Sequence, residues 1–487
     1  MRPWASARAV SAISVTAMLV TLSAGARAQE QPTTAGVTRD TTAVPEDDAA
    51  WRQRMETRMQ QLEEENARLR TQVGDVAETQ QAVMKDAQER GIVTVEGGQP
   101  RLTTPDFFDL NKYASEGDFP GSLRIPGTKT SFQIGGYVQL DAIFDGDKIG
   151  NNDGFAVSSI PTDGGGGNEG AGNTNFSVRQ SRLFMKTQTP TDTAWGSLVT
   201  YIEIDFMGTD GTEPRLRHAY GQIGDKKQLL AGQTWSAFQD ATVFPSTLDA
   251  QGPPGMITSR RPQVRYRQDF NEHWLGVIAL EDPTTELTTP AGFDGADASA
   301  LPDLAGHVRW NQDWGHLQLG AVVRYLEFDP NTGGRENGLG YGLNLSGSYK
   351  TIKLNEKQFD SILFQIAGGN GIARYINDTG GLGLDGVIVA PGDDLQALNA
   401  VAAMLAYQHW WSAKWGSTLG YSFVWLDDEA GQAGTDYQSG QYAVVNLRYY
   451  PTDRVMLGGE VLYGVREDVD GSNGDDLRLQ FSVQYKF

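Results

Sequence analysis

The 487-residue chain contains no cysteine and only five histidines. The lack of cysteine excludes disulfides and thiolate sites. The histidines are scattered, without the i, i+4 pairs typical of metal ligands. Neither a G-x-S-x-G elbow nor a phosphate loop ending in lysine occurs. We therefore expect no catalytic residues, no metal and no cofactor, although a hydrolase assembled from distant His and Ser residues is an open alternative.

Positive charge is also scarce. The chain has 40 Lys and Arg against 61 Asp and Glu, for a net charge of −21, which argues against general nucleic-acid binding. After the first 28 residues no run of about 18 apolar residues occurs, so no transmembrane helix is indicated. This test does not exclude transmembrane strands, because half of their residues face a lumen and they form no long apolar run.

The first 28 residues have the features of a signal peptide. Arg2 and Arg8 supply the positive end, an apolar stretch follows, and the small residues of "ARA" end at Ala28. We expect cleavage after Ala28 and export of the protein. Residues 29–50, rich in Thr, Pro, Ala and Asp, are expected to form a flexible linker.

Residues 51–90 show a heptad pattern that predicts a coiled coil, with a further linker over residues 91–130. One such helix cannot bury its own apolar stripe, so it needs copies of itself; a lone helix folded back on the rest of the protein is the alternative. Asn66 and Gln80 fall on the seam and are expected to select register and oligomeric state. The seam positions are Met55, Met59, Leu62, Asn66, Leu69, Val73, Val76, Gln80, Val83 and Ala87.

From Ser131 to Phe487 the sequence alternates between apolar and polar residues in about sixteen segments, the period of strands with two different faces. Seven short connections alternate with eight longer ones, as in outer-membrane barrels. Tryptophans near the short turns suit a membrane interface. The last segment, "LQFSVQYKF", keeps its alternation to Phe487, as expected where lipid covers the apolar face. We predict an all-β transmembrane barrel of about sixteen antiparallel strands over residues 131–487, preceded by the helical coiled coil.

Several stretches resemble the DcaP-like family of outer-membrane porins. They are "FPGSLRIPGTKTSFQIGGYVQLDAIFD", "RQSRLFMKT", "RLRHAYGQIG", "GQTWSAFQD" and "RRPQVRYRQ", and the preceding coiled coil matches as well. The resemblance implies a homotrimer of sixteen-stranded barrels in the bacterial outer membrane, a coiled coil in the periplasm and uptake of small anions such as dicarboxylates. The glycine-rich "TDGGGGNEGAGN" sets the first long loop of this chain apart.

Strand parity places a set of arginines inside the predicted barrel. Arginine keeps its charge and binds carboxylates in a forked geometry, and rings of Arg or Lys in a pore favour anions. The alternative is that these arginines pair with inward acids and only steady the wall. The residues expected to line the pore are Arg182, Arg215, Arg217, Arg261, Arg265, Arg267, Arg309 and Arg324. The same parity places Tyr220 outside, Phe423 outside and Ser422 inside.

The third long connection, "QDATVFPSTLDAQGPPGMITS", is more apolar than a solvated loop would be. We expect it to fold inward and narrow the channel, with Phe244, Leu248, Pro253 and Pro254 packed against a wall.

Together these features predict an outer-membrane porin for small organic anions. Its expected partners are copies of itself and membrane lipid. One alternative is a structural anchor that the coiled coil tethers to peptidoglycan. Another is a phosphate-type pore, which a lysine-rich constriction would favour.

Overall fold

The computed structural model describes residues 48–89, 93–96, 99–102, 115–147, 149–163, 172–193, 195–209, 211–331 and 333–487. The predicted signal peptide and nearly all of the linker 29–50 lie outside these residues. The chain divides into two units, Met1–Phe108 and Asp109–Phe487.

The first unit is dominated by one long helix, α2 (Asp48–Glu89), followed by the hairpin of β1 (Val93–Glu96) and β2 (Gln99–Leu102). The apolar seam side chains that the structure describes are exposed: Met59, Leu62, Leu69, Val73, Val76 and Val83. Almost all described residues of the helix are exposed, and the coiled coil stays a prediction. Within the described part of the chain, no helix combines the length and apolarity needed to cross a membrane.

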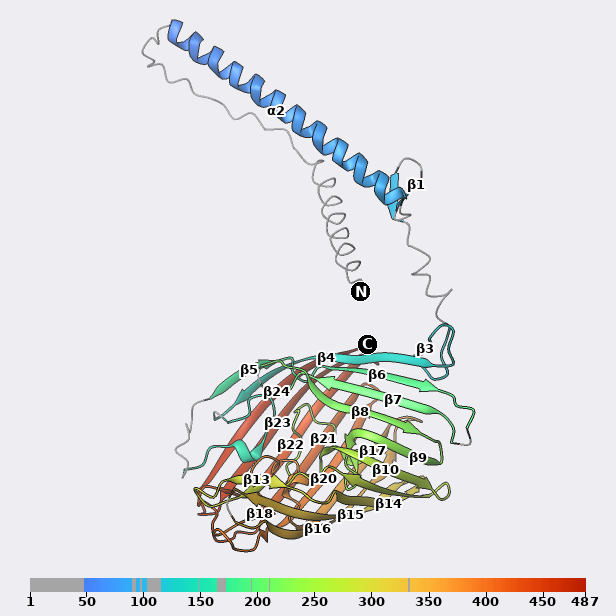
Figure 1. Ribbon diagram of the computed structural model, residues 1–487, viewed down its shortest axis with the longest axis vertical. Coiled ribbons are helices and arrows are strands. Elements are labelled where there is room, and N and C mark those ends of the chain that lie inside the picture. Colours follow the sequence, from blue (N-terminus) through green and yellow to red (C-terminus); the bar gives the residue numbers. More distant parts are fainter. Residues whose placement is uncertain are drawn as a thin grey trace. The chain divides into compact units, whose positions relative to one another are not determined.

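The second unit is a closed antiparallel barrel of sixteen wall strands (Figure 1). The wall strands are β4 (Ser131–Asp145), β6 (Arg182–Thr189), β7 (Leu198–Asp205), β8 (Arg215–Ile223), β9 (Lys227–Trp235), β10 (Arg260–Asp269), β11 (Trp274–Glu281), β14 (Asp303–Gln312), β15 (Gly315–Pro330), β16 (Glu336–Lys353), β17 (Phe359–Asn370), β20 (Asn399–Ser412), β21 (Trp415–Leu426), β22 (Tyr437–Thr452), β23 (Val455–Asp468) and β24 (Asn473–Lys486). The last strand pairs with the first, from Arg478 opposite Asp145 to Lys486 opposite Tyr137, and this pairing closes the wall. The predicted fold class is confirmed.

Shorter elements extend the wall or lie in the loops. They are β3 (Leu123–Arg124), β5 (Asn173–Ser177), β12 (Leu287–Thr288), β13 (Gly295–Ala298), β18 (Gly386–Val387), β19 (Gln396–Ala397) and the 3-10 turns η2 (Val157–Ser159), η4 (Ala241–Val243) and η5 (Ala373–Tyr375). Strands β12, β18 and β19 form a small separate sheet that joins the loops after β11 and β17. Connections at one end of the barrel are tight turns, and those at the other end carry all of these loop elements except β3.

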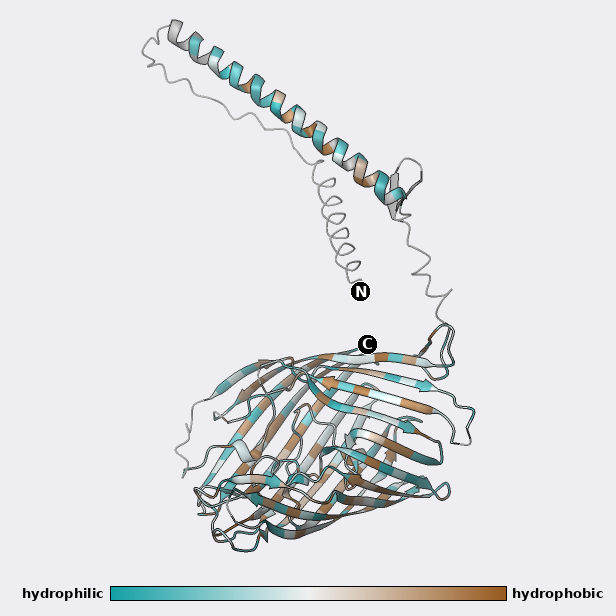
Figure 2. Ribbon diagram, viewed as in Figure 1, coloured by the Kyte–Doolittle hydropathy of each residue, from teal (hydrophilic) through white to brown (hydrophobic). Residues whose placement is uncertain are grey.

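Along the wall strands, polar and apolar residues alternate between the two faces (Figure 2). The outward side chains are apolar and exposed in this single chain, as on β21, where Leu419 and Tyr421 point out while Thr418 and Ser422 are buried inside. Aromatic rings collect beside the short turns: Trp274 stacks on Trp310, and Trp415 stacks on Tyr449. An outward apolar band with aromatic rings at its edge is the surface that a bilayer requires.

A β-bulge in β8 corrects one parity assignment. The register between β7 and β8 shifts between Glu203 and Ile204, so that Arg217 becomes an extra residue. Tyr220 therefore lies on the same face as Tyr201, with ring centroids 5.7 Å apart, and not on the outer face as predicted. The inserted residue reverses the alternation on either side of it.

Outward charge should disrupt the barrel. Phe423→Arg places a cation on the lipid face of β21 and is expected to cost about 2–4 kcal/mol near the bilayer middle. Assembly, measured as the heat-modifiable gel mobility of refolded barrel, should fall sharply. The adjacent inward Ser422 is no suitable control, because its hydroxyl accepts a hydrogen bond from Gly255 N at 2.9 Å and it is fully buried.

The matched control is Gln222→Arg, since Gln222 borders an internal cavity. This variant should assemble like the unmodified protein. Equal damage from Phe423→Arg and Gln222→Arg would contradict the assignment of the two faces.

Candidate functional site

The interior of the barrel is crossed by loop 3, residues 236–259, which joins β9 to β10. Its first part contacts β14, β15 and β16. Side chains of His307, Gln318 and Asn344 hydrogen-bond the backbone carbonyls of residues 237, 239 and 238 at 2.7, 3.0 and 3.0 Å. Its return contacts β21, where Gly255 N donates to Ser422. A side chain at Gly255 would collide with the backbone of this wall, since a Cβ there would lie 2.1 Å from Phe423 O. Loop 3 thus lies directly against the inner wall.

The tip of loop 3 is fastened to β23 by one carboxylate. Glu460 accepts hydrogen bonds from Leu248 N at 2.9 Å and from Asp249 N at 2.8 Å. Asn446 donates to the same carboxylate at 2.7 Å. The side chain of Leu248 lies over Gly458, which leaves room for it. A carboxylate that accepts several short hydrogen bonds holds a buried loop strongly.

The beginning of loop 3 is anchored at Asp240. Its carboxylate accepts hydrogen bonds from His316 Nε2 at 2.7 Å, from Ser346 Oγ at 2.9 Å and from Arg309 Nη2 at 2.8 Å. Burial alone would raise the pKa of Asp240, but the hydrogen bond from His316 and the positive charge of Arg309 outweigh it and hold that pKa well below the usual aspartate range. Asp240 therefore stays ionised and ties the loop to β14, β15 and β16.

A cavity of about 240 Å³ lies between the anchored start of loop 3 and the wall from β8 to β15. Its charged lining consists of Arg265, Arg267 and Arg309 against Asp240 alone. Arg267 forms an ion pair with Asp269 at 2.7 Å. Among the described residues, no hydrogen bond or ion pair joins the guanidinium of Arg265. The cavity therefore carries an excess of positive charge, and Arg265 is its least compensated cation.

A second group of arginines borders the lumen on β6 and β8. Arg215 binds Asp205 in a forked geometry at 3.0 and 2.7 Å. Arg217 bridges Glu203 at 2.6 Å and Asp205 at 2.8 Å. Arg182 lies 3.9 Å from Glu203. These three predicted residues are therefore paired with acidic residues of the wall, which agrees with the alternative that inward arginines steady the wall.

Two predicted pore-lining arginines are instead covered. Arg324 is fully buried between Asp303 at 3.0 Å and Asp385 at 2.8 Å. Arg261 is also buried, against the ring of Tyr375 at 4.2 Å. Both fasten the loops after β11 and β17 to the wall, and neither reaches the open cavity.

The four residues predicted for the constriction loop lie in loop 3. Leu248, Pro253 and Pro254 are buried, and Phe244 packs edge-on against Trp235 at 5.4 Å. Two residues that contact loop 3 or the strand before it were not identified from strand parity. The ring nitrogen of His307 hydrogen-bonds Ala237 O at 2.7 Å, and the guanidinium of Arg260 lies over the Trp235 ring at 5.1 Å. Within the described residues, no group of His, Asp and Glu is arranged to hold a metal ion.

Comparisons with known proteins agree with this architecture. The family model "DcaP outer membrane protein" matches residues 110–487. No curated protein matches the chain.

Several solved structures are also similar to this chain. The outer membrane channel DcaP of Acinetobacter baumannii is 22% identical, with a TM-score of 0.63 over 74% of this chain and 97% of that one. An anion-selective porin from Comamonas acidovorans is 10% identical, with a TM-score of 0.49 over 74% and 100%. OmpT of Vibrio cholerae is 10% identical, with a TM-score of 0.47 over 74% and 98%. Since the family model spans the whole barrel, the chain belongs to the DcaP family of outer membrane proteins and is a porin of the outer membrane.

Proposed function

We propose that the protein is a diffusion channel that prefers small organic anions, with carboxylates and dicarboxylates as its solutes. The observation that carries the proposal is the cavity beside loop 3, where three arginines meet one aspartate. Arginine cannot lose its charge at physiological pH, and its planar fork matches a carboxylate. A local excess of charge in a narrow, partly dry channel acts on a passing ion more strongly than the net charge of the whole protein.

Loop 3 supports this proposal by its position. Its tip fills the side of the barrel near β23 and β24, where Gln480 Nε2 donates to Leu248 O at 3.0 Å. The cavity stays on the opposite side, beside Arg265 and Arg267. An anion crossing the constriction is thereby directed along the cationic wall.

The experiment is a bilayer recording of the purified protein in asymmetric potassium chloride. We expect a reversal potential with the sign of a channel that is more permeable to chloride than to potassium. We also expect added dicarboxylates to block the chloride current more strongly than monocarboxylates do. A potassium-selective reversal potential would contradict the anion preference, and a protein without conductance would contradict the channel.

Two alternatives make different predictions. A phosphate-type pore requires lysines at the constriction, whereas the charged lining of the cavity contains arginine and no lysine. A structural anchor tethered to peptidoglycan requires no open path, and its barrel would not conduct. The bilayer recording separates all three. An anchor gives no conductance, and a phosphate-type pore is blocked more strongly by phosphate than by dicarboxylates added to the same preparation.

We further propose that the protein is a homotrimer joined along its short strands. Strands β6, β7 and β11 have 8 residues each. At about 3.3 Å per residue and about 45° tilt they cover only ~19 Å of membrane, less than the ~25 Å apolar band of such barrels. Outward hydroxyls pair there too, with Thr187 Oγ1 and Thr200 Oγ1 2.6 Å apart. A wall that is short and partly polar is better covered by a neighbouring subunit than by lipid.

The coiled coil is expected to reinforce this trimer. Deleting residues 51–90 removes the exposed seam of α2 and should lower the melting temperature of the trimer in detergent, while the strands still form. Seminative gel mobility against temperature measures the effect. Deleting residues 29–47, which precede α2, is the control and should leave trimer melting unchanged. Unchanged melting without residues 51–90 would contradict a stapling role for the helix.

A further inference from the structure

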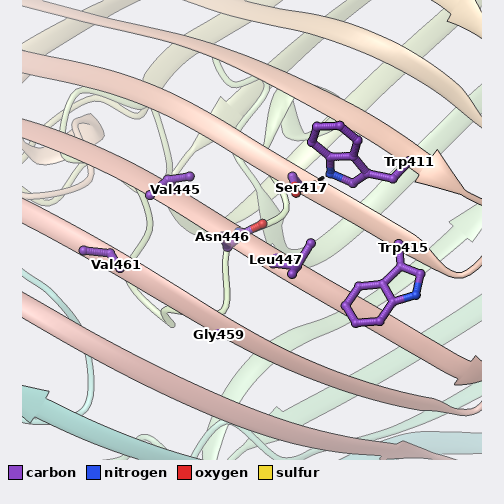
Figure 3. A pocket seen from close by; sticks show the side chains of 8 residues that line it. All are labelled: Trp411, Trp415, Ser417, Val445, Asn446, Leu447, Gly459 and Val461. Atoms are coloured by element: carbon purple, nitrogen blue, oxygen red, sulfur yellow. Dashed lines mark hydrogen bonds between the residues drawn. The ribbon is translucent and has the colours of Figure 1, made fainter.

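The outer face of the barrel carries an apolar groove on β20 to β23, beside the short turns (Figure 3). Its volume is about 650 Å³. It is bordered by outward side chains of Val445, Leu447 and Val461, with the indoles of Trp411 and Trp415 nearer the turns. This groove belongs to the surface that faces away from the lumen and plays no part in the proposed conduction path.

The groove exists because small residues interrupt the wall. Gly459 has no side chain between its cross-strand neighbours Leu447 and Phe481. Ser417 is also small, and its hydroxyl accepts a hydrogen bond from Trp411 Nε1 at 2.9 Å. That bond holds the indole at the edge of the groove, as Figure 3 shows, so the shape is set by the protein.

Three cationic residues lie at the short-turn end of the barrel, beside strands β21 to β24. Lys414 lies in the turn before Trp415, Arg454 lies in the turn between β22 and β23, and Lys486 ends β24. Two backbone hydrogen bonds link these turns to neighbouring strands, Tyr450 N to Lys414 O and Lys486 N to Arg454 O, both 2.8 Å. In the described part of the chain, none of the three cationic side chains has a hydrogen bond or ion pair, and Asp453 is the acid next to them.

Strand length indicates that lipid, and not another barrel, covers this face. Strands β22 and β23 have 16 and 14 residues. At about 3.3 Å per residue and about 45° tilt, 14 residues cover ~33 Å, which exceeds the ~25 Å apolar band. These strands are long enough to span the apolar band of the bilayer, in contrast to the short strands β6 to β11.

We propose that the groove binds one anionic phospholipid of the leaflet on the short-turn side. One acyl chain lies over Gly459 between Val445 and Val461, and the phosphate lies at the rim within reach of Lys414 and Arg454. Apolar contact drives the chain into the groove, and the phosphate interacts with the cations at the membrane surface. The indoles of Trp411 and Trp415 lie where the headgroup meets the acyl chain.

The test uses the full-length protein in nanodiscs of phosphatidylglycerol and phosphatidylcholine, with retained lipid counted by native mass spectrometry after gentle release. Gly459→Leu fills the groove, and its Cβ would make only ordinary contacts, 3.4 Å from the Phe481 ring. We expect retained phosphatidylglycerol to fall roughly tenfold, the effect of losing contact with about two methylenes. Equal retention by Gly459→Leu and the unmodified protein would overturn the proposal.

The matched control is Gly368→Leu, at an outward position of β17 away from the groove, where a Cβ would also find open contacts of 3.6 Å or more. It should keep the bound lipid. A second variant, Lys414→Gln with Arg454→Gln, should abolish the preference for phosphatidylglycerol over phosphatidylcholine. A preference that survives both changes would overturn the assignment of the phosphate.

Occupation by another subunit gives a different result. The chain lacks cysteine, so Val461→Cys introduces a single thiol in the groove. A spin label there should report a lipid environment. A disulfide between two copies at this position would show that the groove is a subunit contact and would overturn the lipid proposal.

Discussion

Replacing both Arg265 and Arg267 by alanine is expected to lower the ratio of anion to cation permeability by about thirtyfold, since each charge contributes about 1 kcal/mol in a partly hydrated site and about 1.4 kcal/mol is a factor of ten. The guanidinium of Arg265 forms no hydrogen bond or ion pair among the described residues, although the charge of Glu281 acts on it, and Arg267 is paired with Asp269 on its own strand. The reversal potential in asymmetric salt should shift towards cation preference. The shift should be larger in dilute salt, because screening is weaker there.

The matched control replaces both residues by lysine. It keeps the charge and removes the forked geometry, so it should preserve the chloride selectivity and weaken only the block by dicarboxylates. If the double alanine variant keeps its anion preference in dilute salt, these arginines only steady the wall, and the proposed cationic path is wrong.

Glu460→Ala is expected to release the tip of loop 3 and widen the channel. The change leaves two buried donors, Leu248 N and Asp249 N, without their acceptor, at a cost of about 1–3 kcal/mol each. Single-channel conductance should rise, and larger solutes should enter in a liposome-swelling assay. The barrel itself should persist, because the substitution changes only a side chain and leaves the backbone hydrogen bonds of β23 in place.

Glu467→Ala is the control, because Glu467 is exposed on the same strand. It should leave conductance unchanged. Conductance and solute size limits that stay the same in Glu460→Ala would mean that loop 3 is held by its remaining contacts, such as those of Asp240, or does not set the width of the channel.

The sequence alone was sufficient to predict the wall of the barrel. Successive side chains of a strand point to opposite faces, so alternation along one segment already separates lumen from membrane. The same local rule identified sixteen strands and short turns opposite long loops. It failed at Arg217, where an inserted residue reversed the alternation and brought Tyr220 inside. The sequence gives no signal for that bulge, because it depends on pairing with β7.

Only the tertiary structure decided which inward residues are open to a solute. Arg324 and Arg265 obey the same parity, yet Arg324 is sealed by Asp385 from a distant loop while Arg265 borders the cavity. Ser422 is likewise covered by Gly255, a residue 167 positions away. Parity is a property of the local backbone, whereas access depends on where loops fold after the barrel closes. The strand pattern therefore determined the faces, and long-range packing of loop 3 and its neighbours determined the site.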